Sequence, residues 1–240
     1  MTTDIELHGA RTGNCLRAAV AFEEAGLPYT PVRLDLRGGD QGAPDYLSLN
    51  PAGKVPTVVD RRGAGAPFVL TQSNAITLWV ADQRPGRLLS VDEPGERARA
   101  LERTFYFIAD VIERSRAAFE LRKSADRDGA DHLDQVALEA AEFSEIFLKE
   151  AAFMAGDRFS LADIAGWTIL HHFESRIDWS GRPRLRRWLD AIAARPVFQR
   201  CIYRSPRLPR RLCSSPLSHQ VFTVISQCFR AIGRHISRSP

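Results

Sequence analysis

The chain has 240 residues, 44% of them hydrophobic, and a formal net charge of +4. This length allows one large domain or two smaller ones. The first residues lack a basic region followed by an apolar run, and no window has the ~20 apolar residues needed to span a bilayer. We therefore expect a cytoplasmic protein.

The positive charge is concentrated near the C-terminus. Residues 201–240 contain seven arginines and no acidic residue, so residues 1–200 carry a net charge of −3. The body of the protein is therefore mildly acidic, and we expect no nucleic-acid partner. The four cysteines show no CxxC spacing, so the sequence predicts neither a metal site nor a disulfide framework.

The first part of the chain alternates between strand and helix patterns. A strand is expected at Ile5–His8, a helix at Cys15–Ala25 that ends at Gly26, and a strand at Tyr29–Leu36. This order predicts a parallel pair with a right-handed crossover. The next expected elements are a short helix, a hairpin and a second helix, at Pro44–Leu49, Pro56–Asp60 with Pro67–Leu70, and Ser73–Gln83. The sum is βαβ followed by ββα on one sheet.

From Glu93 onward the pattern is helical. Helices are expected at Arg97–Ser124, His132–Ala155, Leu161–Glu174 and Pro183–Ala194. A run of α/β structure followed by a run of helices predicts two domains. We place an α/β domain at residues 1–82, a linker at 83–92, an all-helical domain at 93–203 and a basic tail at 204–240.

Three segments carry sequence motifs. They are Asn-Pro-Ala-Gly-Lys-Val-Pro-Thr-Val at 50–58, Leu-Thr-Gln-Ser-Asn-Ala-Ile at 70–76 and Phe-Ser-Leu-Ala-Asp-Ile-Ala at 159–165. In order and spacing they resemble the signature segments of the glutathione transferases. The resemblance implies a thioredoxin-like α/β domain followed by an all-α domain, glutathione as co-substrate, and a homodimer.

The resemblance also implies which residues bind glutathione: Gln41, Lys54, Val55, Pro56, Gln72 and Ser73. A cis bond before Pro56 costs only ~0.5–1 kcal/mol and turns the main chain of Val55 outward, where it can pair with an extended peptide; the alternative is a trans proline that opens an ordinary strand. Gln72-Ser73 precedes a helix, where free amides and a hydroxyl suit the γ-glutamyl carboxylate. In isolation, Ser73 reads as an N-cap.

The first loop provides candidates for activating the thiol. Thr12-Gly13-Asn14 resembles the Thr-Pro-Asn segment of bacterial Nu-class enzymes, so Thr12 and Asn14 are the candidate catalytic residues that hold the glutathione sulfur. Donors at a helix N-terminus lower a thiol pKa from about 8.5. Two alternatives stay open: Asn14 caps the first helix, or Cys15 is a nucleophile as in omega-like members and not a small buried thiol.

Two further patterns are assigned structural roles. Ser160-x-x-Asp163 matches a capping box that satisfies amides at a helix start. His171-His172 does not suggest a metal, because neighbouring residues on a helix point in different directions.

The sequence predicts an enzyme that activates glutathione toward a hydrophobic electrophile or a disulfide. The acceptor pocket is expected around Phe105, Ile108, Ile112 and Phe119. The alternative is a non-catalytic interaction module with the same fold, of the stringent-starvation-protein type, since fold does not settle function.

The tail supports a prediction about truncation. Its apolar residues from Val221 to Ile236 could form a basic amphipathic helix on an anionic membrane, but a mobile extension or a segment that covers the acceptor pocket is the preferred interpretation. We expect a chain truncated after Tyr203 to stay folded and to bind glutathione, because the tail lacks acids and contains proline breaks. Thermal unfolding of both forms checks this: a loss of several degrees on truncation would show that the tail packs on the body.

Overall fold

The computed structural model describes residues 3–124 and 126–198. These residues belong to one compact unit. The predictions for the tail, including its amphipathic helix and the truncation point, lie outside the described residues. None of the described helices is long and apolar enough to cross a membrane.

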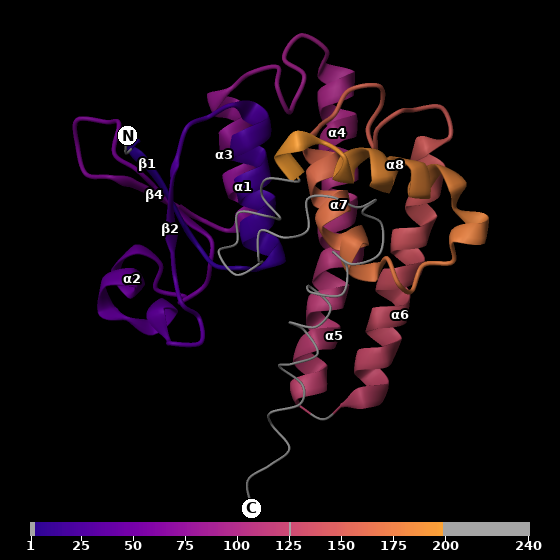
Figure 1. The fold of residues 1–240 in the computed structure, drawn as a ribbon, viewed down its shortest axis with the longest axis horizontal. Helices are drawn as coiled ribbons and strands as arrows, with labels where there is room; N and C mark the ends of the chain where they lie inside the picture. The colour runs from indigo at the N-terminus through magenta and orange to yellow at the C-terminus, as the bar shows by residue number, and fades with distance from the viewer. Residues whose placement is uncertain (1–2, 125, 199–240) are drawn as a thin grey trace, which may run out of the picture. The chain divides into compact units, whose positions relative to one another are not determined.

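A four-stranded mixed sheet forms the first half (Figure 1). Its strands stand in the order β2-β1-β3-β4, where β1 and β2 are parallel and the other pairs are antiparallel. The strands are β1 Ile5–Gly9, β2 Thr30–Arg33, β3 Thr57–Asp60 and β4 Phe68–Thr71. The predicted βαβ and ββα arrangement is confirmed. The second strand is shorter than expected, because the chain turns at Asp35, whose amide donates to the Asp40 carboxylate at 2.6 Å.

Two helices pack side by side against this sheet, α1 (Gly13–Ala25) and α3 (Ser73–Gln83), while the short α2 (Pro44–Leu49) lies apart from them (Figure 1). Helix α1 starts at Gly13 and not at the expected Cys15, because Thr12 caps it by accepting a hydrogen bond from the Cys15 amide at 3.2 Å. It ends at Gly26, whose φ of 65° is left-handed.

The second half is helical, as predicted. Helix α5 lies beside α6 and leads on from α4 through a π-helical segment, η2 (Figure 1). The elements are α4 Pro94–Tyr106, η2 Phe107–Ile112, α5 Glu113–Lys123, α6 Arg127–Phe143, α7 Leu161–Phe173 and α8 Pro183–Ala193, with 3₁₀ turns η1 Asp40–Gly42, η3 Ser144–Leu148 and η4 Trp179–Gly181.

The helix expected at His132–Ala155 is wrong at both ends. It begins at Arg127, because the Asp126 carboxylate caps it by accepting from the Gly129 amide at 2.9 Å. It ends at Phe143, where the chain tightens into η3 and the Ser144 hydroxyl donates to the Ala141 carbonyl. The apolar pattern continues through this 3₁₀ turn, which explains why the sequence favoured a longer helix.

Helix α7 is the most buried helix of the second half. Its predicted capping box is present: Asp163 Oδ2 accepts from both the amide and the hydroxyl of Ser160. Asp163 Oδ1 accepts from the Met154 amide and from Trp188 Nε1, so one carboxylate ties α7 to α8. On α7, Gly166 leaves room for Phe107 of η2, whose ring lies 2.9 Å from where a Cβ would stand.

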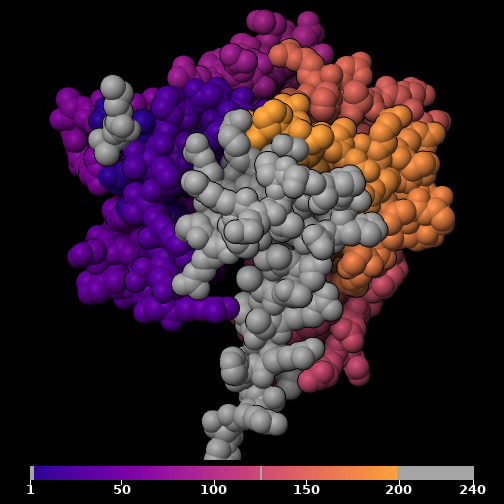
Figure 2. Space-filling model, viewed as in Figure 1, coloured from indigo at the N-terminus to yellow at the C-terminus, as the bar shows by residue number. Residues whose placement is uncertain are grey.

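The two halves are in direct contact. Helix α1 packs against α7, and Figure 2 shows indigo residues of the first half beside orange residues of the helical half. Arg195, after α8, donates to both carboxylate oxygens of Glu24 in α1 at 2.8 and 2.6 Å. The domain boundaries at 83 and 92 stay a prediction.

Candidate functional site

The strand register brings the three predicted site segments to one end of the sheet. His8 of β1 stands opposite Thr57 of β3, and Thr57 stands opposite Thr71 of β4. After β1 come Thr12 and, in the first turn of α1, Asn14; the residues before β3 are Val55 and Pro56, and the residues after β4 are Gln72 and Ser73. Segments far apart in sequence therefore meet at this end of the sheet.

The Val55-Pro56 bond is cis. Among the described residues, no hydrogen bond involves the main-chain amide or carbonyl of Val55, which leaves both groups available to a ligand. The loop is held from behind: the carbonyl of Lys54 accepts from the Tyr46 hydroxyl and from Asn50 Nδ2, both at 2.6 Å. Burial raises the pKa of Tyr46, so its phenol stays protonated and can donate.

Tyr46 was missed by sequence reasoning, since nothing in α2 marks it. Asn50 opens the first motif, and that position was the available signal. The side chain of Lys54 itself is exposed.

Gln41 lies beside this loop. A Cβ on Gly53 would stand 3.1 Å from the carbonyl oxygen of Gln41, and Gly53 has a φ of 58°, so both space and conformation require glycine there. Gln41 Oε1 is buried and has no hydrogen-bond partner among the described residues. This oxygen is therefore an acceptor to which a ligand at this end of the sheet can donate.

Gln72 has an unusual backbone. Its φ of 68° is the positive value of a non-glycine residue, and such strain clusters at functional sites. The next residue, Ser73, starts α3 and is 6% exposed. The first amides of a helix have no partner within it, so the N-terminus of α3 offers donors to an anion.

The guanidinium of Arg17 connects the first turn of α1 with the first turn of α3 in the predicted site. Arg17 Nη1 donates to Asn14 Oδ1 and to the Ser73 hydroxyl, each at 3.0 Å. Arg17 Nε donates to the Thr168 hydroxyl of α7 at 3.3 Å. Asn14 does not cap α1, which is the role of Thr12. Sequence reasoning missed Arg17, although a charged residue among the apolar residues of α1 was a usable signal.

Cys15 is buried, and its sulfur accepts from the Ala10 amide at 3.3 Å. Burial raises the pKa of the Cys15 thiol, while hydrogen bonds from Thr12 and Ala10 act in the opposite direction. A raised pKa disfavours the thiolate, which is the reactive form. These observations favour the small buried thiol over the nucleophile.

The acceptor pocket expected around Phe105, Ile108, Ile112 and Phe119 stays a prediction. Phe105 is 54% exposed and Phe119 38%, whereas Thr104, Phe107 and Val111 of α4 and η2 are buried. The π-helical turn contains one more residue than an α-helical turn and so changes which side chains face inward.

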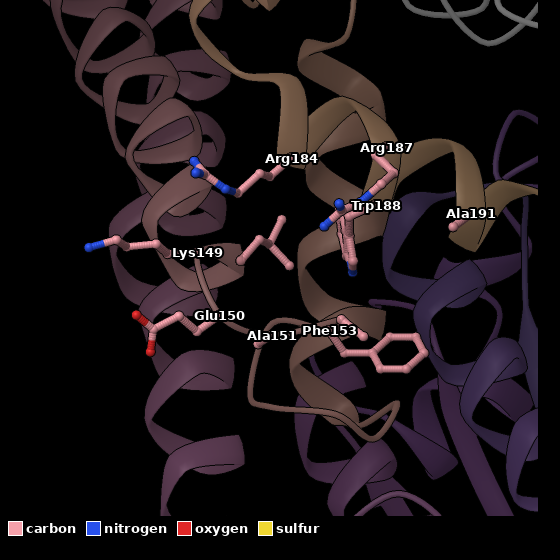
Figure 3. Close-up of a pocket in the computed structure, with 10 residues that line it drawn as sticks. Lys149, Glu150, Ala151, Phe153, Arg184, Arg187, Trp188 and Ala191 are labelled. Carbon is pink, nitrogen blue, oxygen red and sulfur yellow. The ribbon is translucent and has the colours of Figure 1, made fainter.

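A cavity of about 580 Å³ lies elsewhere, between the segment after η3 and α8 (Figure 3). Arg184 and Arg187 of α8 and Lys149 and Glu150 of the segment after η3 are among the residues that line it. None of the predicted site residues lines it. In the described part of the chain, no cluster of His, Cys, Asp and Glu could hold a metal ion.

Comparison with known families agrees with this geometry. Residues 13–83 match the model of the glutathione S-transferase N-terminal domain, and residues 109–191 match that of the C-terminal domain. Glutathione S-transferase 4 of Zea mays is 30% identical over 192 residues, which cover 75% of this chain and 83% of that one. The disulfide-bond oxidoreductase YfcG of Escherichia coli is 29% identical over 199 residues, which cover 80% and 92%.

Solved structures share the fold. A glutathione transferase family member from Pseudomonas fluorescens, crystallised with two glutathione molecules, has a TM-score of 0.73 at 24% identity and covers 82% of this chain and 91% of its own. A glutathione S-transferase from the same species has a TM-score of 0.66 at 26% identity and covers 81% and 97%. The chain belongs to the glutathione S-transferase family.

Proposed function

We propose that this protein is a glutathione transferase that binds glutathione at the end of the sheet where Val55, Ser73 and Asn14 meet. The observation that carries the proposal is the meeting of three complementary groups: an open main chain at Val55, a helix N-terminus at Ser73 and an amide side chain at Asn14. Glutathione has a peptide backbone, a carboxylate and a thiol to match them.

Each residue has a role in this proposal. The amide and carbonyl of Val55 pair with the cysteinyl main chain of glutathione, and Ser73, with the free amides of α3, binds the γ-glutamyl carboxylate. Gln41, Lys54, Pro56 and Gln72 complete the binding surface. Asn14 and Thr12 donate hydrogen bonds to the sulfur; the Thr12 oxygen already accepts from the Cys15 amide, so its proton is available.

The family includes two relevant chemistries. One relative is named a glutathione S-transferase and another a disulfide-bond oxidoreductase. We infer that the activated thiolate of glutathione attacks either an electrophilic carbon, releasing a leaving group, or one sulfur of a disulfide, releasing the other as a thiol.

The direct test is binding followed by two assays. Calorimetry with glutathione measures affinity, and the same preparation is assayed with an aryl halide and with a glutathione-capped disulfide. We expect binding and turnover of at least one substrate. Binding without any turnover favours the interaction module, and absence of binding contradicts the proposal.

Ser73→Ala is expected to weaken glutathione binding by about 1.5–3 kcal/mol, the range for a hydrogen bond to a charged group. Calorimetric affinities of the two proteins measure this. Ser144→Ala is the matched control, because Ser144 is also buried but its hydroxyl donates to the Ala141 carbonyl in the helical half. Equal affinity of Ser73→Ala and wild type would remove the carboxylate site from the proposal.

The proposal includes a homodimer, which the resemblance implies, and a cytoplasmic location, the expectation drawn from the sequence. Light scattering coupled to size-exclusion chromatography measures the mass of the assembly in solution.

A further inference from the structure

Arg17 is a buried cation without an acidic hydrogen-bond partner. It is 3% exposed, and its three hydrogen bonds go to the neutral side chains of Asn14, Ser73 and Thr168. No carboxylate is hydrogen-bonded to it in the part of the chain that the structure describes. Buried charges are usually paired, so an unpaired guanidinium at this place indicates that its counter-charge arrives with a ligand.

The charge persists at neutral pH. Burial lowers the pKa of Arg17 to about 10, and the more distant negative charge of Glu113 acts in the opposite direction. The guanidinium is therefore still protonated near pH 7.

A guanidinium can only donate hydrogen bonds, so both Asn14 and Ser73 must act as acceptors toward Arg17. Asn14 must turn its Oδ1 toward Arg17, because the opposite orientation would place its NH₂ against the Nη1 donor. The two N–H donors of Asn14 then point away from Arg17. The oxygen of Ser73 also accepts from Nη1, so the Ser73 hydroxyl proton is directed elsewhere.

The third contact holds the guanidinium in place. Thr168 donates its proton to the main-chain carbonyls of Ile164 and Ala165 on its own helix, so its oxygen faces Arg17 purely as an acceptor. The helical half thereby fixes the rotamer of Arg17, although Asn14 and Ser73 both belong to the α/β half.

We propose that Arg17 is a positioning residue that turns Asn14 and Ser73 into hydrogen-bond donors for two of the anionic groups of glutathione, its thiolate and its γ-glutamyl carboxylate. This inference rests on the proposed function. Arg17 acts through its neighbours: it sets the direction of their protons and supplies the positive charge that the bound anion balances.

Arg17→Met is the decisive variant, and Arg195→Met is its matched control. Arg195 also bridges α1 and the helical half, through Glu24, but touches neither Asn14 nor Ser73. Calorimetry measures the affinity for glutathione and for S-methylglutathione, which lacks a free thiol. Thiolate absorbance against pH measures the pKa of the bound glutathione thiol.

In Arg17→Met we expect both ligands to bind at least about tenfold more weakly, because the donor toward the carboxylate is no longer oriented. We also expect the pKa of bound glutathione to rise by about one unit, because a nearby positive charge and an oriented donor are lost. Arg195→Met is expected to keep both values. Arg17→Lys keeps the positive charge but loses the planar set of N–H donors. Its glutathione affinity and thiol pKa should therefore lie between those of wild type and Arg17→Met.

The outcomes separate the inference from the function on which it rests. If wild-type protein does not bind glutathione, the proposed function fails. If wild type binds but Arg17→Met keeps the wild-type affinity and thiol pKa, or changes no more than Arg195→Met, only the role of Arg17 is overturned. If Arg17→Met does not fold, Arg17→Lys decides: intermediate values support the role and wild-type values contradict it.

Discussion

Asn14→Ala is expected to slow glutathione turnover by on the order of 10²-fold, whereas Cys15→Ala stays within a few-fold of wild type. The amide of Asn14 offers two donors to a thiolate, and losing a donor to a developing or fixed anion is costly. Cys15 is buried with a raised pKa, so it is largely protonated at neutral pH.

Turnover with saturating glutathione at pH 7 measures this difference, with an aryl halide and with a disulfide as the second substrate. Asn14→Asp is an informative companion, because it keeps the size of the side chain but replaces the donors with a negative charge. The opposite result, with Cys15 essential and Asn14 dispensable, would mean that the protein uses its own thiol.

Asp163→Asn is expected to lower the free energy of unfolding by about 2–4 kcal/mol, since each buried polar group left unsatisfied costs ~1–3 kcal/mol. The carboxylate accepts four hydrogen bonds, two on each oxygen, from Ser160, Met154 and Trp188. An amide can accept on only one side and turns its NH₂ toward two donors on the other. The start of α7 and its link to α8 are weakened together.

Denaturant unfolding followed by tryptophan fluorescence reports this directly, because Trp188 is one of the four donors. Asp157→Asn is the matched control, an exposed acid near the same turn, and it should change the stability by no more than about 0.5 kcal/mol. A loss in Asp163→Asn no larger than in this control would show that the capping box is dispensable.

The sequence predicted the sheet and most helices, because those features depend on local patterns. Apolar periodicity and turn residues determine strands and helices, and the motif around Pro56 marks a loop whose geometry is local. The same logic failed at α6, where Phe143 and Phe147 continue a helical pattern through a 3₁₀ turn, and at η2, where a π-helical segment interrupts the long helix expected at Arg97–Ser124.

The contacts that connect the site could not be predicted in this way. Arg17 meets Ser73 and Thr168, which lie far along the chain, and Tyr46 meets the Lys54 carbonyl through a loop whose path no periodicity describes. Such pairs depend on tertiary packing. What the sequence does offer is the anomaly of an arginine among buried apolar positions of α1.

The backbone of Gln72 has a consequence for how free energy is divided between folding and binding. A non-glycine residue at positive φ costs roughly 1–3 kcal/mol, and this cost falls on the folded protein before any ligand arrives. In exchange, the first turn of α3 is already formed before a ligand arrives. A ligand that docks there loses less of its binding energy to the ordering of the protein, so part of its affinity is set when the chain folds.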